Sequence, residues 1–343
     1  MKKKLYYGWI MTAAAFVVIG LGTYFSINSF GIYVAPVVKD LGIPVASFTL
    51  CATIMAFMIA ISGSFAGKIV DKKGIKFTAV LGALIMALGY IILGLAKSLP
   101  LFYVGYALIG VTCSILGPLL TSSFCARWFV KYRGLVNGII SAGGGLFATI
   151  CAPLLAKSIV AGGYSKTYFM CLIAVAVILV VTLIFFRDKP EDMGLYPDGA
   201  DAPAGKAEAK VEMPGFTLKQ AVKTSGFWLV SIGFIAYMFA DLAIFQTYNA
   251  NIQSVGFDPI LAASVVGICG LAQIPAKILY GFITDKISIK ASTVIGFGFL
   301  IAAALLTVTF TPQTSKGILY LFAVLFAFGH GCWPPLFMKY VLR

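Results

Sequence analysis

The sequence has few charged residues, and very few of them are acidic. Only 11% of its 343 residues are charged, and Asp and Glu together number 12. Sixty per cent are hydrophobic. Ordinary soluble domains carry roughly a quarter charged residues, so this composition excludes such a domain. The scarcity of ionisable residues also leaves none of the His, Asp or Cys clusters that an integral-membrane enzyme needs. We therefore expect no enzymatic activity.

Residues that bind metals are equally sparse. The chain contains one histidine and seven cysteines. The cysteines are scattered in or beside apolar segments, without the spacing of a metal site or of a disulfide framework. We interpret them as small apolar fillers, and we expect no metal and no cofactor.

Long apolar runs are abundant instead. A helix needs about 20 residues to cross the roughly 30 Å hydrocarbon core of a bilayer, and ten runs reach that length. They are too long and too rich in Leu, Ala and Gly for barrel strands, so the sequence predicts an all-α polytopic membrane protein. Gly117-Pro118 predicts a kink in the fourth run. The runs lie near residues 8–34, 46–69, 77–96, 100–125, 134–159, 164–186, 226–250, 260–284, 291–311 and 317–338.

The net charge of +14 is unevenly distributed. If the N-terminus is cytoplasmic, only five of the 26 Lys and Arg lie on the opposite side of the membrane, which follows the positive-inside rule. We therefore expect a multi-pass protein of the inner or plasma membrane with a cytoplasmic N-terminus, and no nucleic-acid partner. The five are Lys39, Lys97, Lys157, Lys166 and Lys316.

One polar hairpin between apolar runs occurs twice. Residues 67–76 (Gly-Lys-Ile-Val-Asp-Lys-Lys-Gly-Ile-Lys) recur as residues 281–290, and the glycine, the aspartate and two lysines keep their spacing over 214 residues. A repeat at this period predicts that the surrounding membrane architecture is repeated too. Ser288 stands where the first copy has Gly74, so the two halves are unequal.

A polar segment, residues 187–225, divides the chain into residues 1–186 with six apolar runs and residues 226–343 with four. Near residues 216–223, apolar residues at helical spacing predict a short amphipathic helix on the membrane surface, and a solvated linker is the alternative. A second half that fully repeated the first would give 12 helices, of which ten are present. We interpret the chain as truncated, with a native ten-helix variant as the alternative.

The hairpin resembles the signature loop of the major facilitator superfamily. Four further stretches resemble the oxalate/formate antiporter and monocarboxylate porter branch of that superfamily. The resemblance implies two helical bundles around a central cavity that opens alternately to each side, and it implies carboxylate substrates of the oxalate, formate or lactate type. The stretches are residues 7–10 (Tyr-Gly-Trp-Ile), 127–138 (Arg-Trp-Phe and Arg-Gly-Leu), 190–199 (Pro-Glu-Asp-Met-Gly-Leu and Pro-Asp-Gly) and 227–228 (Phe-Trp).

Lys277 is the first candidate substrate-binding residue. Counted back from Asp285 at ~1.5 Å per residue, it lies roughly 12 Å inside the membrane. A lysine at this depth costs at least ~2.5 kcal/mol on insertion scales, so it should face a partner or a wet cavity. The resemblance implies that the basic residue four positions before Gly281 binds the substrate carboxylate. A snorkelling or ion-paired lysine is the alternative.

Departures from the branch that this chain resembles weaken the case for a proton-coupled mechanism. The proton-coupled porters of this branch have an acid one turn before the basic residue, where this chain has Gln273. They also tend to have a lysine in the first span, near Asn28 of this chain. Both departures favour exchange or facilitated movement over proton symport.

Asp241 and His330 are ionisable residues inside predicted spans. We interpret Asp241 as a proton site, as a neutralising partner of Lys277, or as a structural acid. His330 lies about 13 Å inside the membrane, close to the level of Lys277, where a neutral imidazole can hydrogen-bond a substrate; a structural core histidine is the alternative. Further candidates to line a cavity, or to serve as ordinary packing, are Tyr24, Asn28, Tyr33, Gln246, Tyr248 and Trp333.

The hairpin residues are gating candidates. By resemblance, Asp71 contacts neighbouring helix ends and basic residues such as Arg127 or Arg133, and so latches one state of the transport cycle. Asp285, in the altered second copy, is expected to matter less. The full gating set is Gly67, Asp71, Lys72, Gly74, Arg127, Arg133 and Asp285.

These observations predict a monomeric secondary transporter of small organic anions, with a major-facilitator-type two-bundle fold and 10 of an expected 12 helices. One alternative is an efflux carrier for drugs or other metabolites, for which an acid-lined pocket would be expected. A second alternative is a truncated, non-transporting remnant. The proposed substrate-binding residues are Lys277, His330, Gln273, Tyr24, Asn28 and Trp333, and the possible proton site is Asp241.

Overall fold

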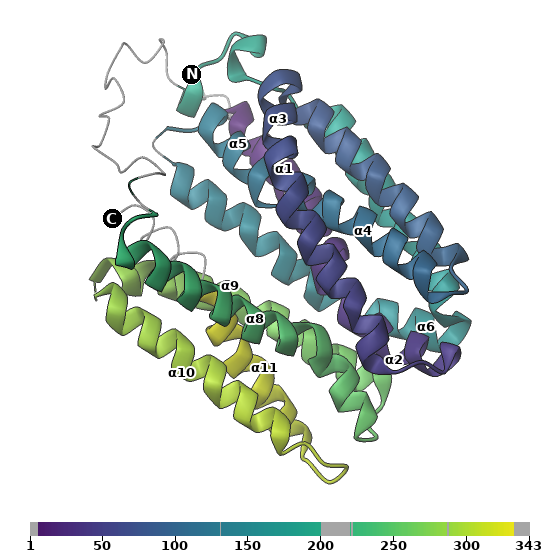
Figure 1. Cartoon of the computed structure of the whole chain (residues 1–343). Helices are drawn as coiled ribbons and strands as arrows, with labels where there is room; N and C mark the ends of the chain where they lie inside the picture. The colour runs from purple at the N-terminus through teal and green to yellow at the C-terminus, as the bar shows by residue number, and fades with distance from the viewer. Residues whose placement is uncertain (1–5, 131, 200–219, 221, 287, 333–343) are drawn as a thin grey trace.

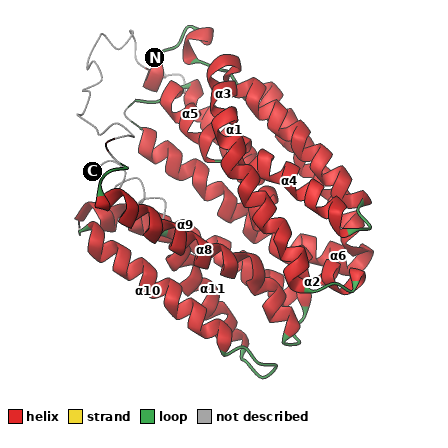
Figure 2. Cartoon of the chain, viewed as in Figure 1, coloured by secondary structure: helices red, strands yellow, loops and turns green. Residues whose placement is uncertain are grey.

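The computed structural model describes residues 6–130, 132–199, 220, 222–286 and 288–332. Within these ranges the regular elements are all helices and no strand occurs (Figure 2), which confirms the all-α expectation. Most of the predicted amphipathic helix near residues 216–223 lies outside the described residues.

The first apolar run forms a helix whose winding changes midway. α1 (Tyr7–Thr23) continues into the π-helical turn η1 (Tyr24–Asn28) and then into α2 (Phe30–Leu41). π-Helical turns are rare, and they occur frequently at functional sites. Two of the predicted site residues, Tyr24 and Asn28, are the first and last residues of this turn.

Two long helices each cover two of the predicted apolar runs. α3 (Val45–Leu95) turns at Gly74, with φ 86° and ψ 173°, and α6 (Arg133–Phe185) turns at Gly163, with φ 79° and ψ 166°. Glycine adopts this region freely, whereas other residues are strained there by about 1–3 kcal/mol. Each glycine therefore marks the point where one apolar segment ends and the next begins.

The fourth apolar run is divided as predicted. α4 (Leu99–Leu116) and α5 (Pro118–Trp128) are separated at Gly117. Pro118 occupies the first position of α5, where its missing N–H is not needed for a helical hydrogen bond. The kink expected from Gly117-Pro118 is confirmed.

The second copy of the hairpin uses different local chemistry from the first. The Ser288 hydroxyl accepts a hydrogen bond from the Ala291 amide at 3.2 Å and so caps the next helix. The replacement of glycine by serine thus gives a helix N-cap in place of a positive-φ turn. The polar segment contains η2 (Pro190–Met193) and η3 (Pro197–Gly199), and the second half consists of α8 (Ser225–Ser254), α9 (Pro259–Lys286), α10 (Ile289–Val308) and α11 (Lys316–Gly331).

Among the described residues, eight helices are long and apolar enough to cross a membrane, and α11 is a shorter apolar helix. The segment Val136–Phe185 counts as one of the eight, although it covers two predicted runs. The multi-pass helical architecture is therefore confirmed, and the number ten stays a prediction. Large apolar side chains such as Phe239 (79% exposed) and Val308 (84% exposed) lie on outer faces, which suits contact with lipid.

The two halves of the chain touch through two pairs of helices (Figure 1). α2 packs against α8, and α6 packs against α9. The second contact is close because a Cβ atom on Gly145 would collide with the carbonyl oxygen of Gly270. Small residues allow helix backbones to approach each other in a membrane, where packing and hydrogen bonds replace the hydrophobic effect between helices.

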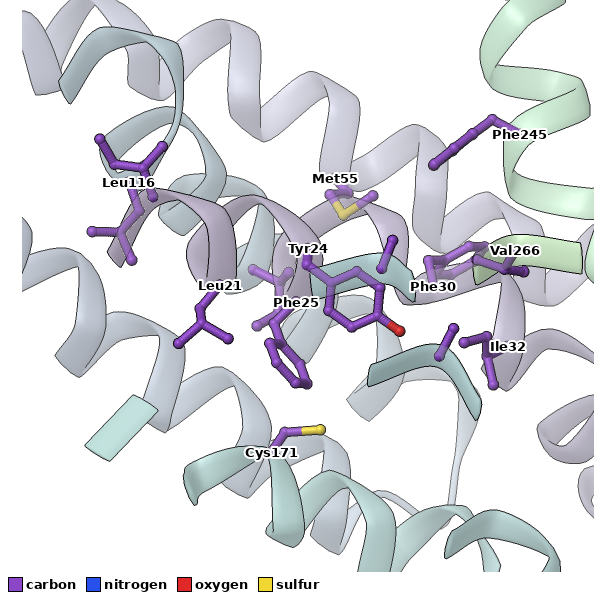
Figure 3. Packing of buried hydrophobic residues seen from close by; sticks show 14 of the residues in the cluster. Leu21, Tyr24, Phe25, Phe30, Ile32, Met55, Leu116, Cys171, Phe245 and Val266 are labelled. Atoms are coloured by element: carbon purple, nitrogen blue, oxygen red, sulfur yellow. The ribbon is translucent and has the colours of Figure 1, made fainter. Parts of the chain in front are cut away.

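The interior of the first half contains many buried aromatic residues, and Figure 3 shows Tyr24, Phe25 and Phe30 beside aliphatic side chains. Tyr33 and Tyr168 stack with ring centroids 4.1 Å apart and an interplanar angle of 14°. The Tyr168 hydroxyl lies 2.8 Å from the hydroxyl of Tyr106, and the Tyr33 hydroxyl lies 3.3 Å from Cys171 Sγ. Stacking and paired hydroxyls stabilise helix contacts inside a bilayer. Tyr33 is therefore a core residue of this half, which favours the packing interpretation over the cavity one.

Three of the four stretches that resemble the antiporter branch lie together at one end of the first half. The rings of Tyr7 and Trp128 are 6.0 Å apart, and the Val130 amide donates to Asp198 Oδ2 at 2.9 Å. The Tyr6 hydroxyl donates to the Trp128 carbonyl at 3.0 Å. Burial, with the nearby carboxylate of Asp198, raises the pKa of the Tyr6 phenol to about 12, so it keeps the proton that it donates.

Candidate functional site

Lys277 is a cation without a counter-charge among the residues that the structure describes. It lies in α9, and its side chain is partly exposed. Its ammonium makes no hydrogen bond and no ion pair in the part of the chain that the structure describes. One turn earlier, Gln273 is 4% exposed, and its amide nitrogen lies 3.7 Å from Cys269 Sγ. Lys277 therefore lies beside no carboxylate among the described residues.

Asp241 is paired with His330 and not with Lys277. Nδ1 of His330 lies 2.8 Å from Asp241 Oδ2 and 3.0 Å from Oδ1. The Asp241 side chain is 1% exposed and the His330 side chain is 21% exposed. A carboxylate removed from water needs a close hydrogen-bond donor, and His330 supplies it. Of the alternatives left open for Asp241, neutralisation of Lys277 is the one that this geometry contradicts.

Aromatic rings hold the imidazole of His330 in place. Phe245 of α8 stacks on it at 5.2 Å with an interplanar angle of 12°, and Phe326 of α11 lies at 5.9 Å and 29°. The Tyr237 hydroxyl donates to the carbonyl of Gly329 at 2.9 Å, which ties the preceding residue to α8. The pair therefore links α8 and α11 in a defined geometry.

The structure places Lys277 and His330 at similar levels of the second half. A Cβ atom on Gly331, the residue after His330, would lie 3.0 Å from Ala276 Cβ and 3.5 Å from the backbone nitrogen of Lys277. Helix counting from the two chain positions had predicted nearly equal depths. Trp333, another predicted substrate-binding residue, lies outside the described residues.

The predicted residues of the first half lie in and near the contact with the second. Tyr24 is fully buried, and its hydroxyl has no hydrogen-bond partner. The Tyr248 hydroxyl lies near Tyr24 and the Cys269 thiol. Asn28 is partly buried. Tyr24 and Tyr248 thus bring two hydroxyls to the region between the halves (Figure 3 shows Tyr24).

The first hairpin is anchored by contacts that differ from the predicted ones. Nη2 of Arg127 donates to the Val70 carbonyl at 2.9 Å, so Arg127 binds the helix end next to Asp71 and not its carboxylate. Asp71 and Lys72 are exposed, and no ion pair of Asp71 occurs among the residues that are described. The expected ion pair between Asp71 and Arg127 is absent from this conformation, and the contact of Asp71 with a helix end stays a prediction. The side chains of Arg133 and Asp285 are outside the described ones.

Asp188 is a hairpin contact that sequence reasoning missed. It follows α6, and its Oδ1 accepts a hydrogen bond from the Lys76 amide at 3.0 Å. Nζ of Lys76 donates to the Leu183 carbonyl at 2.8 Å. Gly74 is essential to this arrangement because a Cβ atom there would overlap the Asp188 carboxylate. An acid directly after an apolar run, beside a basic hairpin, is the signal that could have indicated it.

The described residues form apolar helices that are long enough to cross a membrane and that pack as two halves, as in a multi-pass membrane protein. The chain belongs to the Major Facilitator Superfamily, whose family model matches residues 10–343. Members of this superfamily are membrane transporters and not enzymes. The expectation of the superfamily is thereby confirmed.

The related proteins include transporters with different named substrates. The chain is 25% identical to the oxalate:formate antiporter of Oxalobacter formigenes over 79% of this chain and 62% of that protein. It is 22% identical to the MFS-type transporter YhjX of Escherichia coli (strain K12), over 83% and 70%. It is also 22% identical to the sialic acid transporter NanX of the same organism, over 77% and 62%. The chain thus spans about two thirds of the length of these relatives.

Solved structures show the same fold at low sequence identity. A bacterial homologue of the human lysosomal transporter Spinster, in an inward-facing and unoccupied conformation, matches with a TM-score of 0.70 and 16% identity, over 99% of this chain and 76% of that one. A D-xylose–proton symporter matches with a TM-score of 0.65 and 12% identity, over 96% and 82%. At these identities the likeness concerns the fold alone.

Proposed function

We propose that the chain transports small organic anions by alternating access, with Lys277 as the cation that binds the substrate carboxylate. The observation that carries this proposal is the absence of a partner for Lys277 among the described residues, although α9 places it inside the apolar part of the second half. Asp241, the acid of the neighbouring helix, is already engaged by His330.

The energetics favour an anionic ligand. An uncompensated lysine inside a span costs at least ~2.5 kcal/mol, and an anion that binds beside it offsets part of this cost. A primary ammonium acts as a point charge with rotatable donors, which suits a small carboxylate. Gln273, one turn away, adds a side-chain amide in the same region.

The relatives support this substrate class without establishing it. One is named for oxalate and formate and another for sialic acid, and all three compounds are organic acids. A riboflavin transporter of Trypanosoma brucei brucei is 30% identical over 47% of this chain. The substrates of the relatives are therefore varied, and the anion class rests on Lys277.

The contacts between the halves suit an alternating-access mechanism. We take residues 1–186 and 226–343 as two bundles joined by the cytoplasmic segment 187–225, within a monomer of the inner or plasma membrane whose N-terminus is cytoplasmic. A Cβ atom on Gly31 of α2 would lie 3.0 Å from the Gln246 carbonyl oxygen of α8, near the C-terminal end of the first predicted apolar run. This contact closes the outer side in the proposed orientation, and the hairpin around Asp71 controls its reopening.

Counterflow in proteoliposomes tests the proposal. The chain is reconstituted with internal oxalate, formate, lactate or pyruvate, and uptake of the labelled anion is compared for wild type, Lys277→Gln and Lys316→Gln. Lys316 is an exposed lysine at the first position of α11, so its variant controls for the loss of one positive charge. We expect Lys277→Gln to lose uptake and Lys316→Gln to retain it. Equal uptake by wild type and Lys277→Gln would refute the role of Lys277.

The second candidate is an efflux carrier for drugs or other metabolites. A fungal relative, the Fujikurins efflux protein of Gibberella fujikuroi, is 24% identical over 80% of this chain. A cation-binding pocket would need an acid that is free to contact the substrate, whereas both carboxylate oxygens of Asp241 lie within 3.0 Å of His330 Nδ1. Lack of carboxylate transport by an active preparation would favour this candidate.

A further inference from the structure

His330 has one nitrogen engaged and one nitrogen available. Nδ1 faces both oxygens of Asp241, so in the neutral imidazole the proton lies on Nδ1 and Nε2 carries a lone pair. Nε2 has no hydrogen-bond partner in the described ranges, and the side chain is 21% exposed. A carboxylate that fixes the tautomer of a histidine in this way leaves the second nitrogen poised to take up or release a proton.

We propose that the Asp241–His330 pair binds one proton together with the transported anion, and that protonated Nε2 donates a hydrogen bond to the substrate carboxylate. This inference rests on the proposed function, because it assigns a second contact to the anion that Lys277 binds. It also makes proton-coupled movement available to a chain in which Gln273 and Asn28 replace the ionisable residues of the proton-coupled porters.

The proton balance of the pair is simple. In the empty state, neutral His330 donates from Nδ1 to the Asp241 carboxylate. A proton from the aqueous phase then binds Nε2 and produces an imidazolium that keeps the Nδ1 contact. The new N–H points away from Asp241, because the two ring nitrogens face different directions. It can therefore donate to a carboxylate, whereas the lone pair of the neutral ring repels one.

The charge balance around the pair favours joint binding. With neutral His330, the Asp241–His330 pair carries one negative charge, which repels an anion at Lys277. With protonated His330, the pair is neutral, and the anion meets only the positive charge of Lys277. Binding of the proton and binding of the anion therefore favour each other by the same factor, as thermodynamic linkage requires.

Other titratable groups surround the pair but carry no competing charge. From α8 and α11, Tyr237 and Cys332 lie beside Asp241. From α9, Cys269 lies near both Asp241 and Lys277. These three groups are neutral at pH 7, because free thiols and phenols titrate above that pH.

The remaining neighbouring helices add little. α10 contributes an apolar side chain, Phe297, against Tyr237. α2, which packs on α8, carries Tyr33, which is turned into the first half, and Lys39 and Asp40 at its exposed end. Asp241, His330 and Lys277 are therefore the groups that decide the charge of the site.

The single histidine of the chain makes a direct test possible. The chain is labelled with ¹⁵N-histidine and placed in lipid nanodiscs, and the imidazole nitrogen signals are recorded near pH 7 with and without saturating oxalate or formate. These anions stay ionised between about pH 6 and pH 8, since carboxylic acids titrate near pH 4. We expect the anion to shift the imidazole population toward the doubly protonated form in wild type and not in Lys277→Gln.

Transport measurements with matched variants complete the test. Asp241→Asn keeps a hydrogen-bond acceptor but removes the charge, and His330→Gln removes the titratable group. We expect wild-type affinity for the anion to rise roughly tenfold from pH 8 to pH 6, because protonated His330 adds one charge-assisted hydrogen bond to the anion. We also expect proton uptake to accompany uptake of the anion. His330→Gln should transport without this pH dependence. Asp258→Asn, an exposed acid at the start of α9, is the control that should behave as wild type.

The outcomes separate the two proposals. One outcome is that anions are transported through Lys277, but the anion changes neither the imidazole signals nor proton movement, and His330→Gln leaves the pH dependence unchanged. In that case the proton-binding inference is wrong and the proposed function stands. If no carboxylate is transported and none alters the imidazole signals, both are wrong.

Discussion

Replacing Gly74 with alanine tests how the first hairpin is held. Two costs add at this position. An alanine at φ 86° and ψ 173° is strained by about 1–3 kcal/mol. Its Cβ atom would also overlap the Asp188 carboxylate, which must then release the Lys76 amide that it binds at 3.0 Å. A lost hydrogen bond to a partly exposed carboxylate adds about 1 kcal/mol.

Gly163 provides a matched control for the strain alone. Its backbone, with φ 79° and ψ 166°, is nearly the same, but no atom lies within 4 Å of a Cβ built there. Gly163→Ala should therefore cost about 1–3 kcal/mol, and Gly74→Ala should cost about 1 kcal/mol more. The difference between the two variants measures the contact with Asp188.

The chain carries its own reporter for this comparison. Six of its seven free cysteines are buried, so a thiol-reactive dye reports thermal unfolding in detergent. Gly74→Ala should have the lower Tm, and the difference from Gly163→Ala should vanish when Asp188→Ala is present in both. Equal Tm values in the presence of Asp188 would refute the argument, because they would mean that the close approach to Asp188 contributes nothing.

Three other predictions use the same assays. Lys277→Met should raise Tm while abolishing anion transport, because it removes an uncompensated charge of at least ~2.5 kcal/mol from a span; an unchanged or lower Tm would contradict this. Gly145→Leu should separate α6 from α9, because its side chain collides with Gly270. Distances between spin labels on the two halves should then increase. The control Gly144→Leu should leave these distances unchanged, because a Cβ atom at Gly144 has no neighbour closer than 3.6 Å. Stability should fall as pH rises from about 10 to about 12, because the phenol of Tyr6 has its pKa raised to about 12 and deprotonates first in the unfolded state. Tyr6→Phe should weaken this fall. Identical pH profiles of stability for wild type and Tyr6→Phe would contradict the prediction.

Much of the helical architecture could be predicted because it depends on local properties. Apolar run length predicted membrane-spanning helices, Gly117-Pro118 predicted the break between α4 and α5, and helix rise predicted similar levels for Lys277 and His330. Each of these inferences needs only the chain near the residue concerned. The turns at Gly74 and Gly163 also fall between predicted runs, because a glycine adopts the positive φ that each turn needs.

The partners of the site residues could not be predicted, because they lie far apart along the chain. Asp241 and His330 are 89 residues apart and Asp188 and Lys76 are 112 apart. The sequence left three interpretations open for Asp241, and none of them identified His330 as its partner. Only the packing of α8 against its neighbours decides which side chain reaches the carboxylate.

The sequence by itself determined that this chain is a helical membrane protein with a duplicated hairpin, because hydrophobicity, charge asymmetry and repeats are properties of the chain read in order. It also identified Lys277 as an anomaly, since a lysine in an apolar helix is visible without a structure. The tertiary structure decided that Asp241 engages His330 while no described side chain pairs with Lys277, and that Asp188 meets the hairpin at Gly74. Those outcomes depend on how helices approach one another in three dimensions, where glycine contacts and aromatic stacking set distances that no local pattern records.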